Sequence, residues 1–153
     1  MKTKTVALTI SLVFVSVALG FQNDPHIGTW KLNEAKSKFA GKARNHTVVY
    51  EVAGDQIKVT VDGVDENGGS IHNEWIGKFD GKDYPVTGDT TSDTRAYRMI
   101  DKHTLELANK KDGKTTLTGR IVVSHDGKSR TVTTTATDTQ GKKVTNLAVY
   151  DKQ

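Results

Sequence analysis

The sequence predicts an all-β protein, an antiparallel up-and-down barrel of about 8–10 strands. From His46 onward apolar and polar residues alternate with a period of two, which is typical of strands that bury one face. Glycine-containing turns separate these segments, and no segment after Phe39 has the length of a crossover helix. Neighbouring strands should therefore pair antiparallel. Two packed sheets, as in a β-sandwich, are the alternative.

The first twenty residues have the features of a secretory signal peptide. Lys2 and Lys4 make a basic start, residues 6–17 are almost all apolar or small, and residues 18–20 offer small side chains for cleavage. The apolar run is shorter than the roughly 20 residues of a transmembrane helix. We therefore expect a signal peptide over residues 1–20, one domain over residues 21–153, and a secreted or periplasmic location.

The composition limits how this chain can be stabilised and what it can bind. It contains no cysteine, so disulfides and thiolate metal ligands are excluded, and stability must come from burial and closure of the sheet. The formal charge of +4 falls by two without Lys2 and Lys4. The remaining lysines lie singly at expected turns and do not predict a nucleic-acid surface.

The first strand is expected at residues 27–32 and contains Gly28-Thr29-Trp30. Glycine lets another part of the chain approach closely, and the indole can close one end of a barrel. Residues 33–39 form the one predicted helical turn, with Asn33 as its N-cap.

A repeated tripeptide marks several of the expected turns in the rest of the chain. Asp-Gly-Lys occurs at residues 80–82, 112–114 and 126–128, and Gln-Gly-Lys at residues 140–142. Asp-Gly favours tight hairpin loops because glycine accepts a positive φ, so each strand should lie beside its predecessor. The expected strands after the first are residues 46–52, 57–61, 71–79, 84–86, 95–100, 104–109, 115–124, 130–137 and 143–151.

These features resemble the calycins, the superfamily of lipocalins and intracellular fatty-acid-binding proteins. The resemblance rests on Gly28-x-Trp30, the rhythm of strands and turns, and Tyr150 near the end of the chain; the overall character is similar to that of secreted bacterial lipocalin-like proteins. It implies a barrel that carries a small hydrophobic molecule. Fatty-acid-binding proteins hold a ligand carboxylate with a terminal Arg-x-Tyr, but Ala148 stands in place of that arginine. Residues 33–39 are also too short for their helical lid.

The inward faces of the later strands carry small and polar residues, which predicts a cavity in a barrel of this size; the alternative is that threonine only reflects strand propensity. Arg95 shares a face with Tyr97 and is the candidate for binding a ligand carboxylate, unless it is an exposed strand residue. Core packing is the alternative role for each aromatic candidate. The candidate ligand-binding residues are Tyr50, Trp75, Arg95, Tyr97, Asn146 and Tyr150.

The sequence contains no recognisable catalytic motif, phosphate-binding glycine loop or metal-binding helix. We therefore predict no enzyme activity, no cofactor, no metal ligand and no stable membrane insertion. The predicted function is secreted binding of a small, largely hydrophobic molecule inside the barrel, without covalent chemistry. The alternative is a structural or envelope-interaction module whose barrel holds no ligand.

Overall fold

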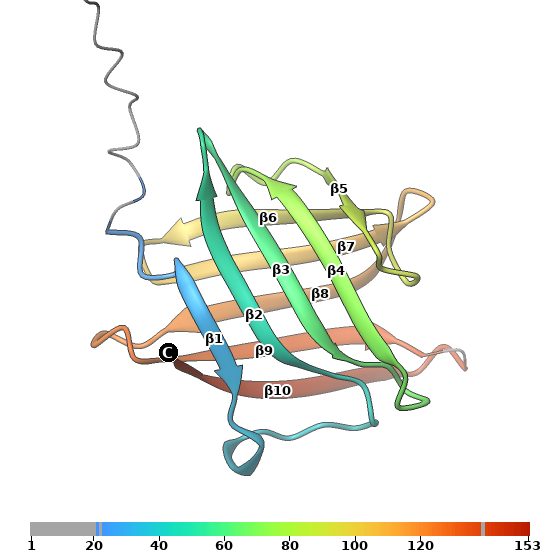
Figure 1. Ribbon diagram of the computed structural model, residues 1–153. Coiled ribbons are helices and arrows are strands. Elements are labelled where there is room, and N and C mark those ends of the chain that lie inside the picture. The colour runs from blue at the N-terminus through green and yellow to red at the C-terminus, as the bar shows by residue number, and fades with distance from the viewer. Residues whose placement is uncertain (1–20, 22, 139) are drawn as a thin grey trace, which may run out of the picture.

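The computed structural model describes residues 21, 23–138 and 140–153, and the expected signal peptide lies outside them. In this part of the chain ten antiparallel strands form one closed barrel (Figure 1), which confirms the predicted fold class and makes the sandwich alternative wrong. The described part of the chain has no helix with the length and apolarity to span a membrane. The strands are β1 (Gly28–Leu32), β2 (Arg44–Ala53), β3 (Gln56–Val64), β4 (Ser70–Gly77), β5 (Tyr84–Thr87), β6 (Thr94–Asp101), β7 (Thr104–Lys111), β8 (Lys114–Val123), β9 (Ser129–Thr137) and β10 (Lys143–Lys152).

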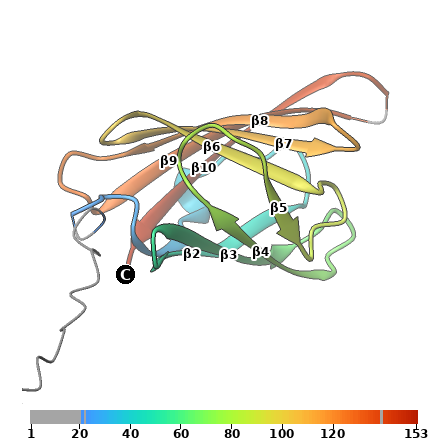
Figure 2. The ribbon, with the colours of Figure 1, turned by 90° about the horizontal axis from the view of Figure 1, so that it is seen from above.

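Each strand pairs with its neighbour in sequence, and β1 closes the barrel between β2 and β10. Trp30 of β1 stands opposite Val48 of β2 on one side and Lys152 of β10 on the other. Seen from above (Figure 2), β2–β4 form one wall of the barrel, and β7 and β8 lie across from them. Within the described ranges the single helical element is the 3-10 turn η1 (Glu34–Lys36), capped by the Asn33 side chain as expected.

The weakest seam of the barrel lies around β5. This strand pairs two residues with β4 and two with β6, whereas β7 and β8 share eight pairs. Pro85 has no N–H to donate. The chain between β4 and β5 instead follows β6, because Gly81 N donates to Tyr97 O at 2.9 Å and Met99 N donates to Phe79 O at 3.1 Å.

The repeated glycine turns are confirmed as connections between paired strands. Asp112 and Gly113 form the two-residue loop between Lys111 and Lys114, with φ of 49° and 75°, as the right-handed twist of a hairpin favours. Residues 126–128 and 140–142 lie in the β8–β9 and β9–β10 connections, and both pairs of strands are antiparallel neighbours. Residues 80–82 lie between β4 and β5, which also pair, but Asp80 forms a bridge with Arg98 of β6. This connection is therefore wider than a two-residue loop, and the predicted strand 71–79 ends earlier, at Gly77.

One end of the barrel is closed by Trp30, which is completely buried. Its Nε1 donates to His26 O at 2.9 Å, and Lys152 Nζ lies 5.0 Å from its ring and donates to Pro25 O at 3.0 Å. Glycine is required at position 28, because its φ of +129° is a conformation that residues with a side chain rarely adopt. We refer to this end as the closed end.

Large side chains fill much of the interior above the closed end. Trp75 and Tyr97 pack edge to face with centroids 4.7 Å apart, and Tyr50 meets Tyr97 at 6.1 Å, both within the range of favourable aromatic pairs. The buried core comprises Trp30, Val48, Tyr50, Ile57, Val59, Val61, Trp75, Val86, Tyr97, Leu105, Ile121, Val123, Ala148 and Tyr150.

Candidate ligand site inside the barrel

A cavity of about 100 Å³ remains inside the barrel, lined from β2, β3 and β6–β10. Drug-sized ligands ordinarily occupy about 300–1,000 Å³, and a 150 Å³ apolar cavity is known to hold benzene. The barrel is therefore neither hollow nor solid, and it has room for only a few heavy atoms. The apolar part of the lining is Val48, Val61, Leu107, Leu117, Ile121 and Val132, and the polar part is Asn45, Tyr50, Arg95, Tyr97, Asn109, Arg130, Thr134 and Tyr150.

Arg130 of β9 is the most unusual group in this lining. Only 2% of it is exposed, and its guanidinium carbon lies 4.8 Å from the ring centroids of Trp30 and Tyr50 and 4.9 Å from that of Tyr150. Within the described residues its Nε and Nη1 are buried without a hydrogen-bond partner, and no acidic side chain pairs with it. The three rings compensate the buried charge only in part, because a cation–π contact is weaker than a charge-assisted hydrogen bond.

The tyrosine hydroxyls beside Arg130 remain protonated at neutral pH. Burial raises the pKa of Tyr150 to about 12 against the opposing effect of Arg130, and burial followed by Tyr97 raises the pKa of Tyr50. Tyr150 Oη donates to Asn45 O at 3.1 Å. Among the polar groups of the cavity lining, these tyrosines therefore give Arg130 neutral neighbours and no counter-charge.

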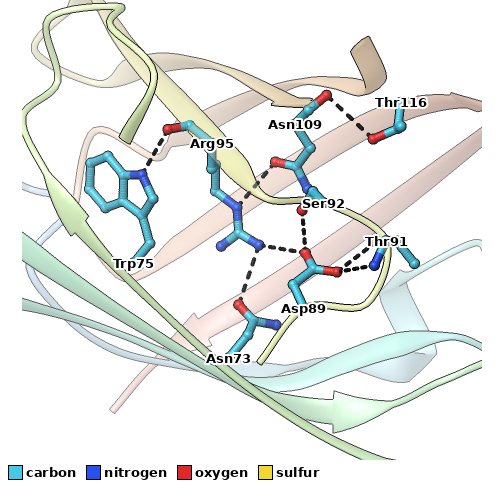
Figure 3. A network of polar contacts seen from close by, with 8 residues as sticks. All are labelled: Asn73, Trp75, Asp89, Thr91, Ser92, Arg95, Asn109 and Thr116. Carbon is cyan, nitrogen blue, oxygen red and sulfur yellow. Dashed lines mark hydrogen bonds and ion pairs between the residues drawn. The ribbon is translucent and has the colours of Figure 1, made fainter. Parts of the chain in front are cut away.

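Arg95 of β6 also lines the cavity, but its surroundings already compensate its charge. Nη2 lies 3.3 Å from Asp89 Oδ2, Nη2 also donates to Asn73 Oδ1 at 3.3 Å, and Nε donates to Asn109 Oδ1 at 3.1 Å (Figure 3). The Arg95 side chain is only 7% exposed and that of Asp89 11%. This network ties the loop between β5 and β6 to the inside of the barrel.

Asp89 is held in its ionised form by the same loop. Ser92 Oγ donates to Asp89 Oδ2 at 2.5 Å, and Thr91 donates to Oδ1 through its backbone N at 2.8 Å and its hydroxyl at 2.7 Å. Burial raises the pKa of Asp89, but these bonds and the charge of Arg95 outweigh burial and keep it below its usual value. Arg95 therefore has a permanent anionic partner.

Four of the six predicted ligand-binding residues lie in the lining of the cavity, and two do not. Tyr50, Arg95, Tyr97 and Tyr150 line the cavity. Trp75 is fully buried in the core and donates from Nε1 to Arg95 O at 2.8 Å, so it supports Arg95 rather than facing the cavity. Asn146 accepts from Ala40 N at 2.8 Å and is not part of the lining.

Arg130 was missed as a site residue, although the sequence held a signal for it. It alternates with Val132 and Thr134, which line the cavity, and so lies on the inward face of its strand. Nothing in the sequence distinguishes a compensated inward arginine from an uncompensated one, because the partners come from distant strands.

A larger hollow of about 640 Å³ lies on the outer face of β6–β9. Its walls are short residues such as Ala108 and Thr133, together with Arg120 and the ion pair between Arg98 and Glu106. This groove is open to solvent, so its charged groups can be hydrated and place no demand for a ligand. We refer to it as the outer groove.

The described residues contain no group of three or more His, Asp or Glu side chains arranged to hold a metal ion. His72 and Glu74 share a face of β4, but the nearest partner of His72 is Asp62, with Nδ1 2.6 Å from Oδ1 in an exposed position.

No family model and no curated protein matches the chain. Among solved structures it is similar to zebrafish ileal bile acid-binding protein in complex with cholic acid, with a TM-score of 0.50 and 15% sequence identity over 84% of this chain and 99% of that one. At this identity the likeness is one of fold. The closed ten-strand antiparallel barrel of the described residues matches a calycin-like fold.

Proposed function

We propose that this protein binds a small organic anion with an apolar body inside its barrel, and that it performs no covalent chemistry. The observation that carries this proposal is Arg130, a buried guanidinium beside a cavity with no anionic partner in the described residues. A buried charge is strongly unfavourable unless it is paired. A ligand carboxylate beside Arg130 would supply that pair, and the aliphatic part of the lining would hold the rest of the molecule.

The volume of the cavity limits the size of the ligand. A cavity of about 100 Å³ accommodates a short carboxylate, whereas a rigid steroid acid, such as the cholic acid bound by the similar zebrafish protein, requires much more space. The short pairing of β5 with both neighbours marks the place where the wall would open to admit a ligand.

Propionate and 1-propanol test the proposal, because they share a three-carbon chain and differ in charge. Calorimetric titration should give tighter binding for propionate. Arg130→Met should weaken propionate binding by about 10–100-fold, the equivalent of one charge-assisted hydrogen bond. Arg120→Met is the matched control, because Arg120 lines the outer groove, and it should leave the affinity unchanged. Equal affinity for the two compounds, or an unaltered affinity in Arg130→Met, would contradict the proposal.

A filled barrel with a structural or interaction role is the second candidate function. The observations that favour it are the near-complete packing of the interior and the larger hollow on the outer face. Failure of the wild-type protein to bind any short carboxylate, with the fold intact by circular dichroism, would favour this function over ligand carriage.

We also propose that the protein is exported after removal of residues 1–20. The support is the basic start, apolar run and small cleavage residues of that segment. Intact-mass measurement of protein recovered outside the cytoplasm should give a chain that begins at Phe21. A mass that still includes Met1 or Lys2 would contradict cleavage.

A further inference from the structure

Two histidines from different turns face each other at the closed end of the barrel. His103 lies in the turn between β6 and β7, and His125 lies in the turn between β8 and β9. Their ring centroids are 5.2 Å apart and the ring planes are inclined by 47°. Figure 1 shows both turns at the end of the barrel where the C-terminus lies.

Hydrogen bonds hold the backbone of both turns in place. His103 N donates to Asp101 Oδ1 and Val123 N donates to His103 O, each at 2.8 Å. The turn that carries His125 is closed by Ser124, whose N donates to Ser129 O at 2.8 Å and whose hydroxyl donates to Asp126 Oδ1 at 2.6 Å. Two turns fixed in this way preorganise the pair.

Neither imidazole has another partner among the described residues: no hydrogen bond or ion pair reaches either ring, and His103 Nδ1 is buried without a partner. The other histidines differ in this respect. The His72 ring contacts Asp62, and His46 Nε2 lies 4.0 Å from Glu34 Oε1. His26 is fully buried at the closed end of the barrel.

The spacing of the two rings is suitable for a shared metal ion. A zinc ion lies about 2.0–2.1 Å from a ligating nitrogen and about 3.2 Å from the ring centroid, so two imidazoles at angles of 90–109° place their centroids about 4.5–5.2 Å apart. Rotation about the side-chain torsions remains open to His125, which is exposed. Neighbouring Asp101 and Asp126 add negative charge, although Lys102 and Lys128 partly offset it.

We propose that His103 and His125 form a two-histidine site for a borderline divalent transition-metal ion, with Zn²⁺, Ni²⁺ and Cu²⁺ as the class it accepts and water as the remaining ligands. Neutral imidazole suits these ions, whereas Mg²⁺ and Ca²⁺ prefer oxygen. This site is separate from the barrel cavity and does not depend on the function proposed for it.

A zinc titration followed by long-range ¹H–¹⁵N spectra of the imidazoles tests this site, because each histidine ring reports separately. The signals of His103 and His125 should shift together and saturate at one equivalent, while those of His46 and His72 should remain in place. Shifts spread over His46 and His72, or the absence of saturable binding at millimolar Zn²⁺, would overturn the proposal.

Single substitutions test whether the two rings act as a pair. His103→Gln and His125→Gln should each lower zinc affinity about tenfold or more, because the second ligand in a linked pair binds at a high effective concentration. His46→Gln is the matched control and should have no effect. Unchanged affinity in either turn variant, with amide spectra showing an intact fold, would overturn the site.

Discussion

The guanidinium of Arg130 lies 4.8 Å from the ring centroid of Trp30, although the two residues belong to strands at opposite ends of the sequence. Lys152 lies 5.0 Å from the same ring. The indole is thus contacted by cations from β9 and β10, and it joins the closure of the barrel to the charged group of the cavity. A substitution of Trp30 should therefore affect both the closure of the barrel and the surroundings of Arg130.

We expect Trp30→Ala to lower the free energy of unfolding by about 3–5 kcal/mol, because it removes a fully buried indole and its cation–π contacts. Urea unfolding followed by far-ultraviolet circular dichroism measures this change. Val122→Ala is a suitable control, because Val122 is 41% exposed, and it should have little effect. Equal midpoints for the two variants would show that Trp30 does not stabilise the closed end.

Arg130→Met should leave the free energy of unfolding unchanged or raise it by about 1–2 kcal/mol in the absence of ligand. An apolar side chain in place of an unpaired buried charge is often neutral or stabilising. A gain in stability together with a loss of propionate binding would identify Arg130 as a residue retained for function. A loss of more than about 2 kcal/mol would mean that the aromatic rings compensate its charge fully.

Asp89→Asn should destabilise the protein by about 2–4 kcal/mol, since it leaves the guanidinium of Arg95 buried without its anion. Adding Arg95→Met to this variant should recover part of the loss, because the two side chains form one network. Asp55→Asn is the matched control on an exposed pair with Lys78 and should leave the midpoint of urea unfolding unchanged. Additive effects of the Asp89 and Arg95 substitutions would contradict the coupling.

Acid should weaken the fold through His26. Burial first, and then the charge of Arg130, lowers the pKa of His26 to about 4 from its ordinary value of 6.5. The unfolded chain therefore binds the proton more readily, so the free energy of unfolding should fall as the pH drops from about 6.5 towards 4, by on the order of 2–3 kcal/mol. Burial raises the pKa of Asp24, which acts in the opposite direction at the lower end.

Urea unfolding at pH 7, 5.5 and 4.5 measures this dependence. His26→Gln should flatten the curve across that interval, because an amide does not titrate, whereas His46→Gln should retain the wild-type slope because His46 is exposed. Identical slopes for wild type and His26→Gln would rule out His26 as the source.

The sequence by itself determined the strands and their order, and it favoured closure into a barrel over a sandwich. A period of two from His46 onward can only place alternate residues on opposite faces, and the Asp112-Gly113 loop accepts the positive φ that a tight hairpin needs. The same parity places Arg95 on one face with Tyr97 and Arg130 on one face with Val132, but only Arg95 was predicted as a site residue. Asp80-Gly81 shows the limit of this reasoning, because the same dipeptide lies in a wider connection between β4 and β5 and forms a bridge with β6 instead of a two-residue loop.

Only the tertiary structure decided which inward arginine is free to meet a ligand. Asp89 approaches Arg95 from the loop between β5 and β6, whereas the rings of Trp30, Tyr50 and Tyr150 surround Arg130 from three different strands. The volume of the cavity likewise depends on how side chains from seven strands pack together. Local sequence fixes the face on which a side chain stands, but charge compensation and free space arise from residues that meet only when the barrel closes.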